Sequence, residues 1–418
     1  MNNWLIKIIA LIFTCTIPFC YKFCYTQTTH ATPPTFQINL DNKPEERWDD
    51  IIQKIPSIKI LEFAQSLQPI IDHSKVKIAP FLPQLLESSI FPQEYKEELN
   101  GIIKSLEKKL GTLPPSLSYE NLFLLNITYE LFVCCTSGII IGKEEVPYLF
   151  RNLDWPLLSS TLRACTINIE WYKNKSCLFK STGFLFLVGV YTGQQDRQFA
   201  ISINSRHLPN GSITENFAYY LKNKNIAWPA SILTRQVLQY AHTYQEAHDL
   251  FKKNPLISPA YIIIAGTNAN EGIILACNRN KIDLTDSIGS WLTHYPHTTT
   301  HVNPRDKNSP LTLNPKDAQT KYIVISNIDS DYSQEDKSLD CKTGCCKSPL
   351  QIEKKYGSTG PKYRRNLALN CCCSLTSNFT TKDLFKQILW MRPIQNKFTV
   401  YSSVMCPQKN IFQSYTDR

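Results

Sequence analysis

The stretch CCTSGIIIGKEEVPYLFRNLD, residues 134–154, decides the fold. Two β-rich segments, 135–141 and 146–152, flank GKEE, a sequence typical of a hairpin turn. We therefore predict that Cys135 lies beside Asn152 and Arg151, with Asp154 just beyond. Because opposite residues of paired strands are neighbours, a thiol, a guanidinium and a carboxylate would then meet at one end of a sheet.

This group has the chemistry of an activated nucleophile, but it lacks a proton acceptor. The Arg151 cation favours a thiolate at Cys135, and Asp154 can orient a base. No histidine belongs to the group. A free α-amine, with an ordinary pKa of about 8, would be a base if the bond between Cys134 and Cys135 were cut. That is how N-terminal nucleophile hydrolases work, whereas the residues alone equally suit a buried or disulfide-bonded cysteine.

The remaining sequence predicts a helical N-terminal piece followed by an α+β body with a large antiparallel sheet. Apolar stripes predict helices near 48–55 and 99–110, and Ser118 is placed to cap a third helix ending near Phe132. Further expected features are an exposed linker at 27–36, helices at 229–242, 243–253 and 382–390, and two long polar insertions at 283–320 and 330–365.

Length, charge and the N-terminus limit the class of protein. The chain has 418 residues, which is enough for one large domain or two ordinary ones. Its net charge of +10 is scattered and forms no basic block, so a nucleic-acid partner is not expected. Residues 1–26 have Lys7 followed by an apolar run to Cys20, which predicts a secretory signal peptide, the alternative being a short membrane anchor.

The cysteines and glycosylation motifs agree with secretion. Twelve of the 15 cysteines follow the signal segment, and such a number suits an oxidising compartment. We expect disulfides rather than zinc at CKTGCC and NCCCSL, and a solvated loop at the histidine-rich HYPHTTTH. N-glycosylation is predicted at four Asn-X-Ser/Thr triplets, beginning at Asn126, Asn174, Asn210 and Asn378.

Several motifs, taken in order, resemble the acid ceramidase and N-acylethanolamine-hydrolysing acid amidase family. They are FQINLDNKPEERW, YELFVCCTSGI, FRNLDWP, FLVGVYTG, LTRQVL, LISPAYIIIAG, SNID and NKFTVYSSVM. The resemblance covers nearly the whole chain after the signal segment. It implies an N-terminal nucleophile hydrolase with an αββα sandwich, made of a helical alpha subunit 27–134 and a beta subunit 135–418 that contains the insertions.

The same resemblance assigns roles to residues. It implies self-cleavage between Cys134 and Cys135, with Cys135 as the nucleophile. Arg151 and Asp154 would be the polar pair beside it, with Asp154 contacting the new amine. Asn327 of SNID would stabilise the oxyanion, and Arg365 is chosen from the pair Arg364–Arg365. No metal and no cofactor are implied.

The implied activity is hydrolysis of a lipid amide at a membrane or micelle surface. Ceramide, split into sphingosine and fatty acid, is the first expectation, and an N-acylethanolamine is the alternative. The resemblance also implies a lysosomal or secreted heterodimer of the two cleavage fragments, with a saposin-like lipid activator. Ser205 replaces a glutamate frequent in the family, which leaves a pseudoenzyme open; the alternative of another class is a secreted disulfide-rich binding protein.

Overall fold

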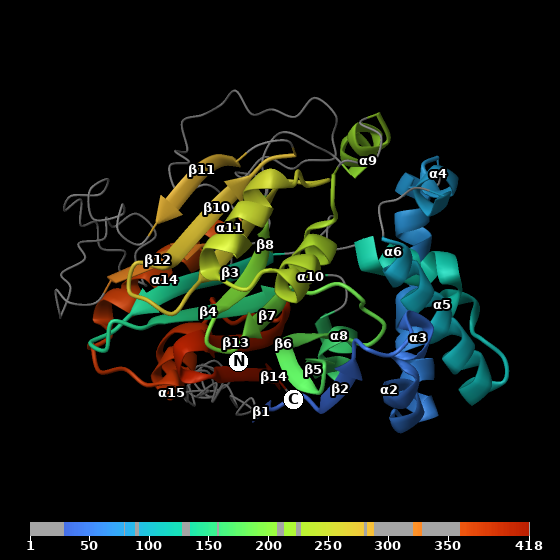
Figure 1. The fold of residues 1–418 in the computed structure, drawn as a ribbon, viewed down its shortest axis with the longest axis horizontal. Helices are drawn as coiled ribbons and strands as arrows, with labels where there is room; N and C mark the ends of the chain where they lie inside the picture. Colours follow the sequence, from blue (N-terminus) through green and yellow to red (C-terminus); the bar gives the residue numbers. More distant parts are fainter. Residues whose placement is uncertain are drawn as a thin grey trace, which may run out of the picture.

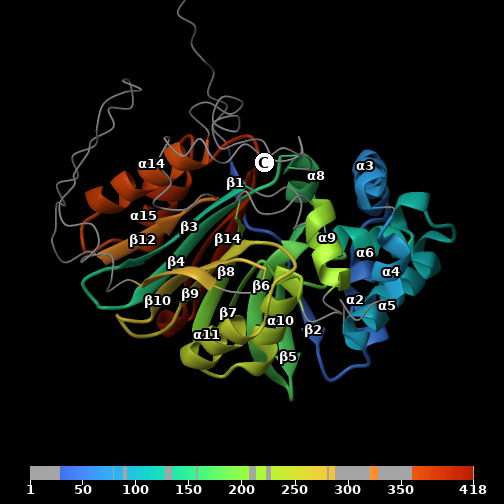
Figure 2. The ribbon, with the colours of Figure 1, turned by 90° about the horizontal axis from the view of Figure 1, so that it is seen from above.

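A computed structural model of the chain describes residues 29–78, 80–87, 92–127, 134–156, 159–206, 213–222, 227–279, 282–287, 321–327 and 360–417. The expected signal segment and most of both expected insertions lie outside these residues. Two β-sheets pack face to face, and helices cover the outer face of each (Figures 1 and 2). Within the described part of the chain, no helix is long and apolar enough to cross a membrane.

The first sheet has six antiparallel strands and contains the hairpin predicted from the sequence. Its order is β1 (His30–Ala31), β14 (Ile411–Asp417), β13 (Thr399–Cys406), β4 (Pro147–Asp154), β3 (Cys134–Ile141) and β12 (Lys321–Ile325). The hairpin strands β3 and β4 lie inside this sheet, so both are paired on each side. Both strands are buried, with apolar residues such as Ile139 and Leu149 in their middle and buried polar residues at the end where Cys135 lies.

The second sheet has eight strands. Its order is β11 (Ile282–Ser287), β10 (Gly272–Cys277), β9 (Ala260–Ala265), β8 (Phe199–Ser205), β7 (Thr192–Gln195), β6 (Ser176–Phe184), β5 (Thr166–Lys173) and β2 (Thr35–Asn39). All neighbours are antiparallel except β2, which runs parallel to β5. The N-terminal piece therefore contributes the edge strand of this sheet.

Alternation along the strands separates three apolar clusters. Ile139 and Ile141 of β3 point to the second sheet and pack with Ile263 of β9. Ile140 points the opposite way and packs with helix residues such as Cys372. A residue on the first sheet therefore faces either the other sheet or the helices, according to its parity.

Helices complete the four layers, as Figure 2 makes plain. The first sheet is covered by α14 (Pro361–Ser374), α15 (Thr381–Leu384) and a π-helical turn at Phe385–Leu389. The second sheet is covered by α10 (Ala230–Tyr240) and α11 (Tyr244–Lys253). Two smaller helices are α8 (Ser159–Ala164) and α9 (Ile213–Lys222).

The N-terminal helices form a separate group at one end of the sandwich (Figure 1). They are α2 (Asp49–Lys54), α3 (Ser57–Ile78), α4 (Leu82–Glu87), α5 (Gln93–Leu110) and α6 (Tyr119–Ile127). The predicted stripes are buried, with Ile52 and Leu99 fully inaccessible. Ser118 accepts the Asn121 backbone N–H at 3.4 Å and so caps α6 as expected.

Three local predictions were wrong. The expected linker 27–36 contains β1 and the start of β2, because two prolines hid strands whose partners lie far along the chain. The first expected insertion begins with β11, and the second ends inside α14. Long-range pairing stabilises β1 and β2, and a local pattern does not report it, whereas β11 pairs with its sequence neighbour β10.

The disulfide prediction at NCCCSL was also wrong. Cys371, Cys372 and Cys373 lie on α14, and Cys372 is part of the apolar cluster beneath it. Free thiols among the described residues are Cys135, Cys165, Cys177, Cys277, Cys371, Cys372, Cys373 and Cys406. All of them are buried except Cys371, which is partly buried, and Cys177, which is exposed. CKTGCC and the predicted histidine loop lie outside the described residues.

Candidate active site

The hairpin register places Cys135 one residue away from its predicted partner. Cys135 pairs with Leu153 rather than Asn152, and Cys134 pairs with Asp154. The turn is shifted because β4 begins at Pro147, one residue later than expected. Cys135 and Arg151 are consequently diagonal neighbours on one face, where a long side chain still bridges them.

The Cys135 thiol is fully buried and lies against a guanidinium. The Nη2 of Arg151 donates to Sγ of Cys135 over 3.0 Å. By parity both side chains enter the space between the sheets, on the same face of the first sheet as Ile139. A cation in this water-poor position stabilises a developing thiolate.

Arg151 is itself held by the second sheet. Its Nη1 donates to the carbonyl of Tyr191 at 3.0 Å and to Oγ1 of Thr192 at 2.6 Å. Thr192 also shares a 2.9 Å hydrogen bond with the hydroxyl of Tyr401, whose ring lies 5.5 Å from the guanidinium carbon. The guanidinium position therefore depends on both sheets.

The backbone nitrogen of Cys135 is oriented by Asn327. In the uncut chain, this N–H donates to Oδ1 of Asn327 over 2.8 Å. The Asn327 amide cannot flip freely, because its Nδ2 donates to the Ser205 carbonyl at 2.7 Å. Ser205, which replaces the family's glutamate, therefore contributes its backbone carbonyl. Any residue at this position would supply the same group.

Asp154 belongs to the same cluster but lies on the helix side of the sheet. Its carboxylate is paired with Arg364 of α14 and accepts hydrogen bonds from Thr399 at 2.7 Å and Asn396 at 3.0 Å. Arg364 also donates to Oδ1 of Asn327 at 3.2 Å. A continuous network therefore joins Asp154, through Arg364 and Asn327, to the Cys135 nitrogen.

Burial dominates the ionisation of both acids. It raises the pKa of the Cys135 thiol above its ordinary value, although Arg151 and Arg364 act in the opposite direction. Burial likewise raises the pKa of Asp154, against the lowering effect of Arg364. The site thus favours a neutral thiol at rest, which needs a base to remove its proton.

Four of the five residues selected from the sequence are brought together: Cys135, Arg151, Asp154 and Asn327. The fifth, Arg365, is a buried residue of the same helix as Arg364, and its role stays a prediction. Sequence reasoning missed Arg364 as the partner of Asp154. The adjacent arginines were the signal, but only the rotational position of the helix determines which one faces the sheet.

Asn204 was also missed. Its Oδ1 accepts the Ser137 hydroxyl at 2.7 Å, and its Nδ2 donates to the carbonyl of Ser326 at 3.2 Å. It therefore ties the end of β8 to β3 and to the residue before Asn327. The available signal was its position, because Asn204 directly precedes Ser205 in the segment Asn-Ser-Arg.

The predicted glycosylation of Asn126 is wrong for this fold. Asn126 is fully buried, donates to the carbonyls of Leu122 and Phe186 at 2.9 Å, and accepts the Val188 N–H at 2.8 Å. A glycan there would replace one of these donors. The triplets at Asn174 and Asn378 are exposed, whereas Asn210 lies outside the described residues.

The fold and this cluster define a class. Two facing sheets between helical layers, with a cysteine at the head of a central strand, are the architecture of an N-terminal nucleophile hydrolase. In that class the base is the terminal amine of the nucleophile, a role that the nitrogen of Cys135 would have only after cleavage before this residue.

Comparisons with known proteins show which proteins this chain is similar to. The profile described as the beta subunit of N-acylethanolamine-hydrolyzing acid amidase matches residues 31–88, within the N-terminal piece. The acid ceramidase of Heterocephalus glaber is 28% identical, covering 95% of this chain and 90% of that protein. The acid ceramidase of Homo sapiens is 25% identical, covering 93% of this chain and 87% of that protein.

Among solved structures, the Caenorhabditis elegans N-acylethanolamine-hydrolyzing acid amidase ortholog is 27% identical. The match covers 66% of this chain and 93% of that one, with a TM-score of 0.45. The sequence matches thus show that nearly the whole chain is similar to acid ceramidases, and that residues 31–88 are similar to the amidase profile.

Proposed function

We propose that the protein is a self-cleaving cysteine amidase that hydrolyses the amide bond of ceramide. The observation that carries the proposal is the position of Cys135. Its thiol receives a hydrogen bond from Arg151, and its backbone N–H is fixed by Asn327. Both functional atoms of an N-terminal nucleophile are therefore oriented before the chain is cut.

Self-cleavage begins with the Cys135 thiol. Its sulfur attacks the carbonyl carbon of Cys134, and the peptide nitrogen leaves with a proton, which gives a thioester and a free amine. Water then hydrolyses the thioester to a Cys134 carboxylate and the regenerated thiol. Asn327 supports this step because it orients the departing nitrogen.

Turnover uses the same thiol and the new amine. The amine takes the thiol proton while sulfur attacks the ceramide carbonyl, and then protonates the departing nitrogen of sphingosine. Water, deprotonated by the amine, attacks the acyl thioester and releases a fatty acid and the thiol. We assign oxyanion stabilisation to Asn327, whose amide nitrogen carries two N–H donors.

Ceramide is preferred over N-acylethanolamines because the relatives that match nearly the full chain are named acid ceramidases. The alternative has its own support, since the family profile bears the name of the amidase. We further propose action in an acidic compartment or after secretion, as the signal-like N-terminus suggests. A saposin-like activator stays a prediction.

Acid incubation of the purified chain tests the first step. We expect two fragments on a reducing gel, one of which begins at Cys135 by terminal sequencing. Cys135→Ala should remain a single chain. Cleavage of that variant after Cys134 would overturn the proposed nucleophile.

The second experiment tests the substrate. Fluorogenic ceramide and N-palmitoylethanolamine are compared at equal concentration with the cleaved wild type and with Cys135→Ala. Faster release from ceramide supports the proposal, and faster release from N-palmitoylethanolamine selects the alternative. A cleaved protein that hydrolyses neither would be the pseudoenzyme or the binding protein.

A further inference from the structure

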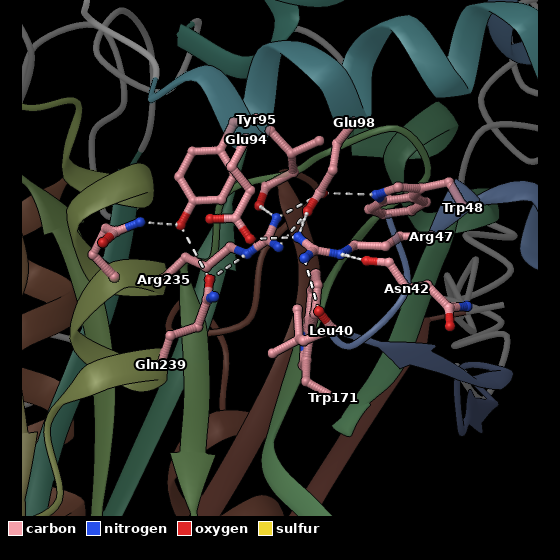
Figure 3. A network of polar contacts seen from close by, with 12 residues as sticks. Leu40, Asn42, Arg47, Trp48, Glu94, Tyr95, Glu98, Trp171, Arg235 and Gln239 are labelled. Atoms are coloured by element: carbon pink, nitrogen blue, oxygen red, sulfur yellow. Dashed lines mark hydrogen bonds and ion pairs between the residues drawn. The ribbon is translucent and has the colours of Figure 1, made fainter. Parts of the chain in front are cut away.

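A buried ion cluster lies where the N-terminal helices meet the body (Figure 3). The carboxylate of Glu98 on α5 accepts a hydrogen bond at 2.7 Å from Arg47, which belongs to the same N-terminal piece. It also accepts two, at 2.6 and 2.8 Å, from Arg235 on α10 of the body. The side chains of Glu98 and Arg235 are fully inaccessible, and that of Arg47 is only 6% exposed. Two cations and one central anion are thus buried at an interface between segments far apart in sequence, and the partly exposed Glu94 is also paired with Arg47.

Neighbouring side chains hydrogen-bond to the charged groups of the cluster and stack against them. The indole N–H of Trp48 donates to Glu98 at 3.1 Å, and Arg235 donates to Gln239 at 2.9 Å. The Arg235 guanidinium carbon lies 4.5 Å from the ring centre of Tyr95 and 4.3 Å from that of Trp171. If one partner is removed, the remaining charge is left unpaired where water cannot solvate it. Loss of any one partner therefore destabilises the cluster.

The cluster also reaches towards the candidate active site. Arg235 donates to the carbonyl of Val188 at 2.8 Å, and Val188 donates its N–H to Asn126 of α6. Three residues further on, the carbonyl of Tyr191 accepts a hydrogen bond from Arg151, which also donates to the Cys135 thiol. The segment 188–191 is therefore held by the N-terminal piece at one end and positions Arg151 at the other.

The proposed cleavage would turn this cluster into a contact between two chains. Cutting between Cys134 and Cys135 leaves Glu98 and Arg235 on different chains. Residues 27–134 contain one cysteine, Cys134 at the cut itself, and Cys165, Cys277 and Cys406 of the body are free thiols. The described part of the N-terminal fragment, residues 29–127, contains no cysteine, so the contacts that hold this part to the body are non-covalent.

We propose that Glu98 with Arg47 and Arg235 is an ionic clasp that keeps the two cleavage fragments together. Its partner is the other fragment of the same chain. The clasp rests on the proposed self-cleavage and goes beyond it, because it assigns a specific set of charges to fragment retention. Separation of the fragments would release segment 188–191 and, with it, Arg151.

The test uses Glu98→Gln, which keeps the shape and removes the charge. The matched control is Asp50→Asn on the same fragment, which breaks the exposed ion pair with Lys54 at 2.6 Å. After acid cleavage, both variants and wild type are diluted in series and their fragments separated by size-exclusion chromatography. We expect Glu98→Gln fragments to separate at concentrations about 100-fold higher than the others, with parallel loss of amidase activity.

A second arm separates failure of the clasp from failure of self-cleavage. A full-length Cys135→Ala chain with a protease recognition sequence inserted between residues 127 and 134 is cut by the added protease, with and without Glu98→Gln. Co-elution of the cut Glu98→Gln fragments at the wild-type dilution would overturn the clasp, whichever way the first arm ends. So would an uncut Glu98→Gln chain that fails to fold, because the cluster would then be a requirement of folding.

Discussion

At the scale of single residues, Arg151 is the side chain that most directly sets the reactivity of Cys135. Its guanidinium donates to the sulfur and opposes the rise in thiol pKa that burial causes. The geometry separates this role from that of Asn327, which acts on the nitrogen. The two residues therefore have distinguishable effects.

Arg151→Met should raise the pKa of the Cys135 thiol further, because burial then acts without its main opposing charge. We expect self-cleavage to slow on the order of 100-fold, with its rate profile shifted towards higher pH. Fragment appearance measured from pH 4 to 9 tests this. Lys173→Met, at an exposed site, is the control, and an unchanged profile in Arg151→Met would contradict the assigned role.

Asn204 is expected to act through Asn327 rather than on the substrate. Asn204→Ala removes the ties to Ser137 and Ser326 and loosens the residue next to Asn327. We expect kcat to fall about 10- to 100-fold with little change in KM, as when a transition-state donor is displaced. Steady-state kinetics measure kcat and KM of Asn204→Ala, with Asn254→Ala as the control. A change in KM alone would refute the role assigned to Asn204.

At the scale of elements, the hairpin was predictable and its closest contacts were not. Its two strands are adjacent in sequence and its turn is short, so local pattern was sufficient. The pairing of β2 with β5 and the choice between Arg364 and Arg365 depend on distant strands and on helix rotation. For the same reason Asn126 seemed an ordinary surface motif.

Gly138 shows how tightly β3 packs. A Cβ placed there would lie 2.5 Å from the Phe150 ring and 2.7 Å from the backbone carbonyl of Ile323. We expect Gly138→Ala to lower the free energy of unfolding by about 1–3 kcal/mol. Urea denaturation of the uncut Cys135→Ala chain measures it. Gly183→Ala, where the nearest atom is 3.6 Å away, should cost less, and equal costs would be inconsistent with the packing argument.

At the scale of the whole molecule, the ionic clasp should tolerate acid. Burial alone would raise the pKa of Glu98, but Arg235 and Arg47 outweigh it and leave the pKa below its ordinary value. Tyr95 and Glu94 also face the cluster. Each of them raises the pKa of Arg235, as Glu98 does. A carboxyl with a depressed folded-state pKa contributes stability above its unfolded pKa, and this is lost as pH falls through the folded-state value.

The stability difference between Cys135→Ala and the same chain with Glu98→Gln should therefore stay constant from pH 7 down to about pH 4.5, near the unfolded pKa. Below that pH it should shrink as Glu98 becomes protonated. Urea unfolding at a series of pH values tests this. A difference that already shrinks between pH 7 and 5.5 would mean that the pKa of Glu98 is raised in the folded chain.

The burial of Asn126 has a consequence for biosynthesis. In a secretory route, its Asn-Ile-Thr triplet is open to modification only while α6 is still unpacked from the carbonyl of Phe186. Folding and sugar transfer then compete for one side chain, and a chain that receives the sugar first cannot form this interior. The yield of native protein would depend on which event is faster. Removing the triplet by Thr128→Val should therefore raise secretion.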